Sequence, residues 1–406
     1  MTNTAKKSAE SPAVSLATNA VSREGTAGNL LIVDDKPANL RLLAAMLTKQ
    51  GYKVRSAISG SLALTAARAA PPELILLDIN MPEMNGYEVC QQMKADEKLR
   101  DIPIIFISAL DETEDKVNAF TVGGVDYITK PFQLEEVLAR VRTHLSLRNL
   151  QKELQEANRK FKEELDLAGQ VQASFLPARC PDMPGWECSA KLIPARETSG
   201  DFYDLIPLHR GRRGFMVADV TDKGTGAALY MALSRTLLRT YAWKYDMQPE
   251  MALRNTHQRI LEDIKTNQFV TVFYGILDPA SGVLIYCNAG HPSPCIFSSE
   301  KRTVRELENN GPPLGLRLFE DEVWGTGEVR MRPGDTLMLY SDGLTEARNS
   351  QGEFFGEERL KEAGRVRRKG SVRDMQESIF AALHDFVGDA PQADDITLMF
   401  LSRLAH

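Results

Sequence analysis

The sequence predicts a multidomain protein with three parts in chain order. These are an α/β domain with a doubly wound parallel sheet, a helical coiled-coil linker, and an α+β domain made of an antiparallel β-sandwich flanked by helices. The chain has 406 residues, and at about 150 residues per domain this length indicates two or three domains. Strands and helices alternate from residue 30, a long proline-free helical pattern covers residues 134–175, and strands dominate after residue 186.

The composition excludes several classes of protein. Hydrophobic residues make up 43% of the chain and charged residues 26%, which is the balance of a globular protein that buries sizeable cores. No apolar run approaches the about 18 residues that span a bilayer, and the N-terminus lacks the apolar stretch of a secretory signal. The net charge is -6 and no helix-turn-helix pattern is present, which argues against DNA binding. We therefore expect a cytoplasmic protein that contacts neither membrane nor DNA.

The cysteines suit a reducing compartment, because they are few, odd in number and without a Cys-x-x-Cys pair. We expect no disulfide among them. They are Cys90, Cys180, Cys188, Cys287 and Cys295. Cys287, His291 and Cys295 follow one another at intervals of four, but two prolines intervene and no fourth ligand is evident. We therefore favour buried cysteines over a zinc site.

Domain boundaries are placed where the pattern changes. Residues 1–27 are rich in Ser, Thr, Ala and Asn and show no sustained apolar period, so we expect a disordered leader. We assign the parallel-sheet domain to residues 28–146, the linker helix to 147–177 and the second domain to 178–404.

The first domain contains short apolar runs that are typical of buried parallel strands. These runs cover residues 30–33, 74–77, 104–107 and 125–128. Helical patterns separate them at residues 39–49, 60–70, 87–95 and 112–122. In a doubly wound sheet, binding sites lie at the carboxyl ends of the strands.

Polar side chains follow these strands at that edge. Asp34 and Asp35 end the first strand, Asp78 and Ser108 end two others, and Lys130 follows the last. Carboxylates without His or Cys form a hard-oxygen site that suits Mg²⁺, and a carboxylate beside the metal can become an aspartyl phosphate. Each aspartate alone could instead cap the following helix.

Four motifs in this region, LIVDDKP, LILLDINMPEMNGYEV, FISAL and DYITKPF, together resemble the receiver domains of two-component response regulators. The resemblance covers residues 29–147. It implies that Asp78 accepts a phosphoryl group from a sensor histidine kinase or phosphotransfer protein. It also implies that Asp34 and Asp35 bind Mg²⁺ together with Asp78.

The same resemblance assigns three further residues to the response. Lys130 would pair with the phosphoryl group, Ser108 would be the switch hydroxyl, and Tyr127 would be the aromatic switch that changes rotamer.

The long helix carries an apolar heptad pattern. Counting sevens from residue 147 gives two core positions. One holds Leu147, Leu154, Phe161, Ala168 and Phe175, and the other holds Leu150, Ala157, Glu164 and Val171. The pattern predicts a parallel homodimeric coiled coil in which only Glu164 interrupts the core. A helix that packs on its own domain is the alternative, because four heptads are few.

The second domain is expected to contain an antiparallel sheet assembly covered by helices. Apolar runs predict strands at residues 203–206, 215–220, 271–277, 284–288, 323–330, 336–340 and 396–401. Helical patterns cover residues 226–267 and 357–386.

Four motifs in this domain place an aspartate beside an apolar strand: SGDFYD, VADVTDKGTGAAL, YSDGLTEARN and ADDIT. Carboxylates that converge repel one another unless cations neutralise them, so a convergent set indicates two hard divalent ions. Two such ions can activate a water and hold a phosphate. The alternative is aspartates in ordinary turns, which explains the Ser-Asp-Gly of Asp342 well.

These motifs, in this order and with NAGHPSP and PPLGL, resemble the metal-dependent PPM protein phosphatases, in particular their bacterial SpoIIE/RsbU-type branch. The resemblance covers residues 186–401. It implies that Asp219 bridges two Mn²⁺ or Mg²⁺ ions, that Asp201 and the Val220 carbonyl complete one site, and that Asp342 and Asp394 hold the other. Such enzymes hydrolyse phosphoserine or phosphothreonine without a covalent intermediate.

Two residues bear on how the substrate is handled. Eukaryotic relatives carry a general-acid histidine shortly after the bridging aspartate, and this chain has Val220-Thr221 there, so the general acid is unassigned. We interpret His291 as a structural or substrate-loop residue rather than an acid. Arg196 could bind the substrate phosphate through two hydrogen bonds, and a solvated arginine is the equal alternative.

The two resemblances together predict a response regulator whose phosphorylation controls a metal-dependent protein serine/threonine phosphatase. The family resemblance points to a phosphorylated anti-sigma-factor antagonist as the substrate. The alternative is a non-catalytic adaptor whose partner binding is controlled by phosphorylation, and a transcription factor is a third and less favoured reading.

Overall fold

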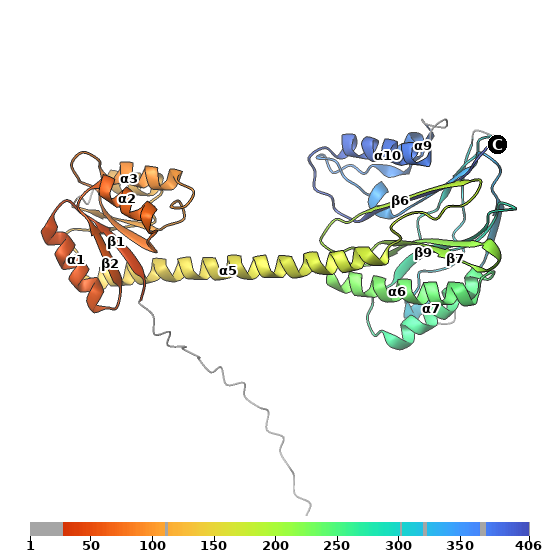
Figure 1. The fold of residues 1–406 in the computed structure, drawn as a ribbon, viewed down its shortest axis with the longest axis horizontal. Helices are drawn as coiled ribbons and strands as arrows, with labels where there is room; N and C mark the ends of the chain where they lie inside the picture. The colour runs from red at the N-terminus through yellow and green to blue at the C-terminus, as the bar shows by residue number, and fades with distance from the viewer. Residues whose placement is uncertain (1–26, 110–112, 301–302, 320–322, 366–370, 406) are drawn as a thin grey trace, which may run out of the picture. The chain divides into compact units, whose positions relative to one another are not determined.

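A computed structural model describes residues 27–109, 113–300, 303–319, 323–365 and 371–405. The chain divides into two compact units, residues 1–158 and 159–406, which are described separately (Figure 1). Residues 1–26 of the expected leader lie outside the described residues. Residue 112, the first of the helix expected at 112–122, also lies outside them.

The first unit contains a five-stranded sheet in the order β2-β1-β3-β4-β5, and all its strands are parallel. The strands are β1 (Asn29–Val33), β2 (Lys53–Ala57), β3 (Leu74–Asp78), β4 (Ile104–Ser108) and β5 (Asp126–Thr129). The helices are α1 (Pro37–Lys49), α2 (Gly60–Ala69), α3 (Gly86–Ala95), α4 (Thr113–Thr121) and the long α5 (Leu134–Phe175). The predicted doubly wound α/β fold is confirmed.

Alternation along the strands explains why this sheet is covered on both faces. In β1, Leu31 and Val33 contribute to one apolar core, and Leu30 and Ile32 contribute to the core on the opposite face. Successive side chains of a strand point to opposite faces, so a continuous apolar run requires cover on both sides. The edge strand β2 was not located from the sequence, because its letters KVRSA lack such a run.

The second unit contains two antiparallel five-stranded sheets, in the orders β13-β10-β9-β8-β7 and β12-β11-β14-β15-β6. The strands of the first are β7 (Phe202–Pro207), β8 (Arg213–Val220), β9 (Val270–Asp278), β10 (Val283–Ala289) and β13 (Gly327–Arg330). Those of the second are β6 (Trp186–Ile193), β11 (Cys295–Phe297), β12 (Val304–Glu306), β14 (Thr336–Tyr340) and β15 (Ile396–Arg403). The helices are α6 (Thr225–Lys244), α7 (Pro249–Asp263), α8 (Asp342–Thr345), α9 (Gly356–Arg365) and α10 (Val372–Val387).

The two sheets form a sandwich with helices on its outer faces (Figure 1). In β8, Phe215 and Val217 pack into the core between the sheets, and Met216 packs into the core under α6 and α7. In β14, Leu339 faces the inner core and Met338 the core under α9 and α10. The predicted antiparallel β-sandwich flanked by helices is confirmed.

The structure differs from the sequence expectations in detail. Strands β6, β11 and β12 were not predicted, and the strand expected at residues 323–330 is confined to Gly327–Arg330. The expectation of no disulfide is wrong for Cys180 and Cys188, whose sulfur atoms the structure joins. Their Cα atoms lie 5.7 Å apart, within the range that a disulfide spans, because the chain turns back between them into β6.

Among the described residues, no helix has the length and apolar character needed to cross a membrane.

Candidate functional site

The first candidate site lies at the carboxyl edge of the parallel sheet. One carboxylate oxygen from each of Asp34, Asp35 and Asp78 lies within 4.8 Å of the other two. Lys130 follows β5, and its Nζ lies 2.9 Å from Asp34 Oδ2 and 2.9 Å from Asp78 Oδ2. The fold therefore brings together the three predicted acids and the predicted lysine.

The charges of this cluster fit a divalent cation. Burial raises the pKa of Asp78, and the neighbouring Lys130 only partly opposes that shift. Burial would lower the pKa of Lys130, but its hydrogen bonds to Asp34 and Asp78 raise it. Asp35 Oδ1 is buried and makes no hydrogen bond to a described residue. Three carboxylates with an unsatisfied buried oxygen form the donor set that Mg²⁺ prefers.

The two predicted switch residues lie on the strands beside this cluster. Ser108 is buried at the end of β4 and pairs in register with Thr129 of β5. The Tyr127 ring contacts Phe120 edge-on at 6.2 Å, and the Arg140 guanidinium of α5 lies 5.6 Å from its centroid. The aromatic side chain therefore contacts the start of the long helix.

Ion pairs attach that helix to the first unit beside Tyr127. Asp126 accepts hydrogen bonds from Arg140 at 2.5 Å, and its second oxygen lies 3.0 Å from His144 Nε2. Burial alone would raise the pKa of Asp126, but its hydrogen bonds to Arg140 and His144 lower it. A change in the position of Tyr127 would therefore act directly on α5.

The second candidate site is formed by the four predicted aspartates of the sandwich. Asp219 lies near the end of β8, Asp201 directly precedes β7, Asp342 begins α8, and Asp394 lies two residues before β15. Asp201 and Asp219 share a side-chain hydrogen bond. The ends of four strands, β7, β8, β14 and β15, thus bring these aspartates to one place.

Burial and mutual repulsion raise the pKa values of three of these aspartates. Burial, and then the charge of Asp342, raise the pKa of Asp219 to about 7. Burial and the charge of Asp219 raise the pKa of Asp201, and burial followed by the charge of Asp394 raises that of Asp342. Divalent cations would neutralise these charges, so the residues fit the two ions that the sequence predicts. The carboxylate oxygens of these aspartates are more widely spaced than those of the first site. Among the described residues, only Asp34, Asp35 and Asp78 bring three ligand atoms within 4.8 Å of one another.

Hydroxyl groups orient the deepest of these acids. Thr397 donates a hydrogen bond of 2.6 Å to Asp201 Oδ2, and Ser341 also bonds the Asp201 carboxylate. Gly200 lies against the Val220 carbonyl, because a Cβ at residue 200 would lie 2.9 Å from that oxygen. The absence of a side chain there keeps the predicted carbonyl ligand close to Asp201.

Asp395 supports the loop that carries Asp201. Its Oδ1 accepts a hydrogen bond from the Ala195 amide at 2.7 Å, and its Oδ2 accepts from the Ser199 hydroxyl at 2.8 Å and the Gly200 amide at 2.7 Å. These three bonds engage both carboxylate oxygens and hold residues 195–200 beside Asp201. Arg196 lies in the same loop and is exposed.

Two further residues contact this site although the sequence did not single them out. Lys223 Nζ lies 2.9 Å from Asp394 Oδ2, and its charge partly opposes the rise in the pKa of Asp342 that burial and Asp394 cause. Gln172 of α5 is buried and makes two hydrogen bonds to Ser199, donating to its carbonyl at 2.6 Å and accepting from its amide at 2.9 Å. Lys223 stands inside the motif VADVTDKGTGAAL, whereas no sequence signal distinguishes Gln172 from other helix glutamines.

His291 is buried behind the aspartate site and contacts the strand next to Asp219. It is 3% exposed, and its Nδ1 lies 2.9 Å from the hydroxyl of Thr271, which pairs with Asp219 across β8 and β9. Burial lowers the pKa of His291 to about 3. A buried neutral imidazole fits a structural role better than that of an acid. Cys287 and Cys295 are also buried.

The raised pKa of Asp219 predicts how stability depends on pH. Its folded-state pKa, about 7, lies above the unfolded value of about 3.9, so this carboxyl stabilises the metal-free fold below pH 4 and loses that contribution as pH rises through 7. We expect the metal-free protein to melt at a lower temperature at pH 8 than at pH 6, and Mn²⁺ to raise the melting temperature more at pH 8.

Differential scanning fluorimetry with and without chelator measures both effects. Asp219→Asn, which cannot ionise, should reduce the difference between the two pH values. A metal-free protein that becomes more stable between pH 6 and pH 8 would contradict this prediction.

Comparisons with known proteins match each of the two units to a family. Residues 30–142 match the response regulator receiver domain, and residues 209–404 match Stage II sporulation protein E (SpoIIE). The chain joins a receiver domain to a SpoIIE-family domain. Asp201 precedes the matched segment, and the structure nevertheless places it in the same sandwich.

Individual relatives each match a part of this chain. Protein IcfG of Synechocystis is 32% identical over 269 residues, which cover 59% of this chain and 41% of that protein. Phosphoserine phosphatase RsbU of Bacillus subtilis is 27% identical over 260 residues, which cover 64% of this chain and 74% of that protein. The SiaA-PP2C domain of Pseudomonas aeruginosa shares the fold, with a TM-score of 0.54 and 24% identity over 61% of this chain and 98% of that domain.

Proposed function

We propose that this protein is a response regulator in which phosphorylation of Asp78 controls a metal-dependent protein serine/threonine phosphatase. The observation that carries the proposal is the convergence of Asp201, Asp219, Asp342 and Asp394 in a SpoIIE-family domain. The matching relative RsbU is named a phosphoserine phosphatase. For this chain we propose domain boundaries at residues 28–146, 147–177 and 178–404.

In the receiver, the Asp78 carboxylate would attack the phosphorus of a phosphohistidine on a sensor kinase or phosphotransfer protein. The phosphorus–nitrogen bond breaks, and the phosphoryl group becomes attached to the Asp78 oxygen. Asp34, Asp35 and Asp78 would hold Mg²⁺, which neutralises phosphoryl charge. Lys130 already lies 2.9 Å from Asp78 and would pair with the new phosphoryl oxygens. The Ser108 hydroxyl and Tyr127 would then reposition.

In the sandwich, the four aspartates and the Val220 carbonyl would hold two Mn²⁺ or Mg²⁺ ions. Such ions supply activation of water and neutralisation of phosphate charge. The protein's own contribution is positional: Thr397 and Ser341 orient Asp201, and Asp395 holds its loop. Arg196 is a candidate to bind the substrate phosphate. We propose a phosphorylated anti-sigma-factor antagonist as the substrate.

The helix α5 is the element that would connect the two activities. Near its start Arg140 contacts Tyr127 of the receiver, and near its end Gln172 bonds the loop that carries Asp201. At Gly169 a Cβ would overlap the Glu197 carbonyl of that loop. A shift of the helix therefore acts on the aspartate site without any intermediate element.

The exposed side of α5 supports the predicted dimer. Leu150, Leu154 and Phe161 are each 62% exposed, although all three occupy heptad core positions. A second copy of the helix would bury this apolar seam in a parallel coiled coil. Apolar side chains at heptad spacing have no other evident use on a helix that connects two domains.

Leu154→Glu is expected to convert a dimer to a monomer, because it places a charge in the centre of the seam. Light scattering coupled to gel filtration measures the mass. Gln155→Glu adds the same charge one residue away from the seam and should leave the dimer intact. A wild-type monomer at micromolar concentration, or a dimeric Leu154→Glu protein, would count against the coiled coil.

Hydrolysis of a phosphoserine substrate and of a small phosphate ester, with and without Mn²⁺ and beryllofluoride, tests the function as a whole. We expect turnover that requires Mn²⁺ and changes when beryllofluoride mimics phosphorylation of Asp78. Asp78→Asn should retain basal turnover and lose the response. Absence of turnover in every condition, including with a phosphorylated protein partner, would favour the non-catalytic adaptor.

A further inference from the structure

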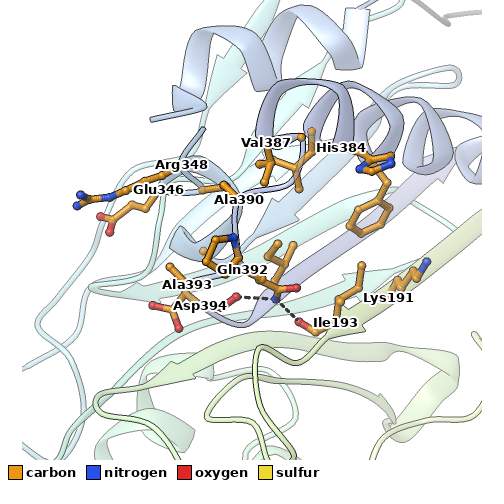
Figure 2. A pocket seen from close by; sticks show the side chains of 17 residues that line it. Lys191, Ile193, Glu346, Arg348, His384, Val387, Ala390, Gln392, Ala393 and Asp394 are labelled. Carbon is orange, nitrogen blue, oxygen red and sulfur yellow. Dashed lines mark hydrogen bonds between the residues drawn. The ribbon is translucent and has the colours of Figure 1, made fainter. Parts of the chain in front are cut away.

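A pocket of about 320 Å³ lies beside the aspartate site, between α10, β6 and the loop of residues 388–394 (Figure 2). Its walls are mainly apolar and include Ile193, Phe380, Leu383 and Val387. This volume is at the small end of the range for ligand pockets, about 300–1,000 Å³. It matches one large apolar side chain with its flanking backbone better than a cofactor.

The pocket is continuous with the proposed active site. Asp394, one of the four predicted metal ligands, lines it, and so does Gly343, the neighbour of Asp342. Figure 2 shows Asp394 at one end of the pocket and His384 and Val387 at the other. A chain segment whose phosphate lies on the aspartates can therefore place a nearby side chain in the pocket.

The loop that forms one wall is held in place. The Gln392 side-chain amide donates hydrogen bonds to the Ile193 carbonyl at 3.0 Å and to the Asp394 carbonyl at 2.6 Å. These bonds connect the loop to β6 on one side and to the aspartate site on the other (Figure 2). A pocket with a fixed wall loses little entropy when a ligand binds.

The charges around the pocket favour an acidic ligand. Lys191, Arg348 and His384 contribute to the lining and are exposed, whereas Glu346 and Asp394 are its acidic residues. Asp394 already pairs with Lys223, so Glu346 is the one remaining acid of the lining against the cations of Lys191 and Arg348. The Lys191 ammonium lies 4.9 Å from the Phe380 ring centroid, so a positive charge stands directly over an apolar wall.

We propose that this pocket binds an apolar side chain of the phosphoprotein substrate, in an acidic segment close in sequence to the phosphorylated residue. The inference rests on the proposed phosphatase function and adds to it a determinant of substrate choice. Binding energy from a side chain remote from the phosphate then distinguishes the protein substrate from small phosphate esters.

Filling the pocket tests the proposal. Ala390 is half-buried in the wall loop, and Ala390→Trp adds a large side chain there. Ala381→Trp, on the exposed side of α10 and outside the lining, is the matched control. The probes are acidic phosphoserine peptides in which a single leucine is moved along positions flanking the phosphoserine, together with p-nitrophenyl phosphate.

Peptide affinity is measured by fluorescence anisotropy and hydrolysis by phosphate release. We expect one leucine position to improve binding at least about tenfold over alanine, the size of effect that burial of one such side chain gives. Ala390→Trp should abolish that preference, whereas Ala381→Trp should keep it and should hydrolyse p-nitrophenyl phosphate like the wild type. A double-mutant cycle between the leucine and Ala390 should show a coupling of the same size.

The outcomes separate this proposal from the phosphatase proposal. Three outcomes overturn the pocket proposal and leave the phosphatase proposal standing, provided that hydrolysis is normal. They are no leucine preference, no peptide binding, and a preference that survives Ala390→Trp. A preference removed by Ala390→Trp in a protein that hydrolyses nothing supports the pocket and rejects the phosphatase. Neither binding nor hydrolysis rejects both.

Discussion

Asp219→Asn is expected to lower kcat/KM for a phosphoserine substrate by about 10³-fold or more, because the variant loses the carboxylate that we propose would hold both metal ions. Asp219 is hydrogen-bonded to Asp201 and lies within the field of Asp342 and Asp394. A factor of 10³ corresponds to about 4 kcal/mol of transition-state stabilisation. The amide keeps the shape of the side chain, so the fold should be preserved.

Steady-state kinetics with Mn²⁺ measure this effect, and a Mn²⁺ titration shows whether the affinity for metal falls with it. Asp222→Asn is the matched control, since Asp222 is exposed three residues further on. Its φ of 70° is a backbone conformation that Asn adopts as readily as Asp. Full activity in Asp219→Asn would contradict the assignment of the site, and equal loss in both variants would point to a general disturbance of the turn.

Gln172→Leu is expected to lower kcat/KM by about 10-fold to 100-fold and to raise the Mn²⁺ concentration needed for half-maximal activity. The leucine would leave the amide and carbonyl of Ser199 buried without partners, at about 1–3 kcal/mol for each group. Ser199 stands two residues before Asp201, and its hydroxyl bonds Asp395 at 2.8 Å. The loop would therefore relax away from the position that the metal requires.

A purely structural role for Gln172 would lower stability without changing the dependence on Mn²⁺, so that dependence is the decisive measurement. Gln170→Leu, two residues earlier on the exposed side of the same helix, should behave like the wild type. Gln172→Glu can still accept from the Ser199 amide and should have an intermediate effect. An unchanged Mn²⁺ requirement in Gln172→Leu would contradict the proposed connection between α5 and the aspartate site.

Most of the first unit could be predicted because its strands are buried on both faces. Parallel strands with both faces covered show as continuous apolar runs, and the edge strand β2, which lacks one, was not located. The acidic site could be predicted equally well, because the carboxyl ends of parallel strands meet at one edge. Once the strands were placed, Asp34, Asp78 and Lys130 had to lie near one another.

The sandwich was harder to predict from its sequence. Its short strands β11 and β12 have only three residues each, too few to show a period. Strand β6 has mostly half-buried side chains, so its apolar pattern is weak. Residue pattern alone could place each aspartate beside a strand, and only the pairing of β7 with β8 and of β14 with β15 brings their ends together.

The sequence by itself determined the two kinds of domain, the heptad seam and the acidic residues that carry the proposed chemistry. These features are local, because each depends on a residue type at a fixed spacing from its neighbours. Only the tertiary structure decided that Gln172 bonds Ser199, that Lys223 pairs with Asp394, and that a pocket lies beside that aspartate. Such contacts join segments distant in the chain, and their geometry follows from how the sheets and helices pack.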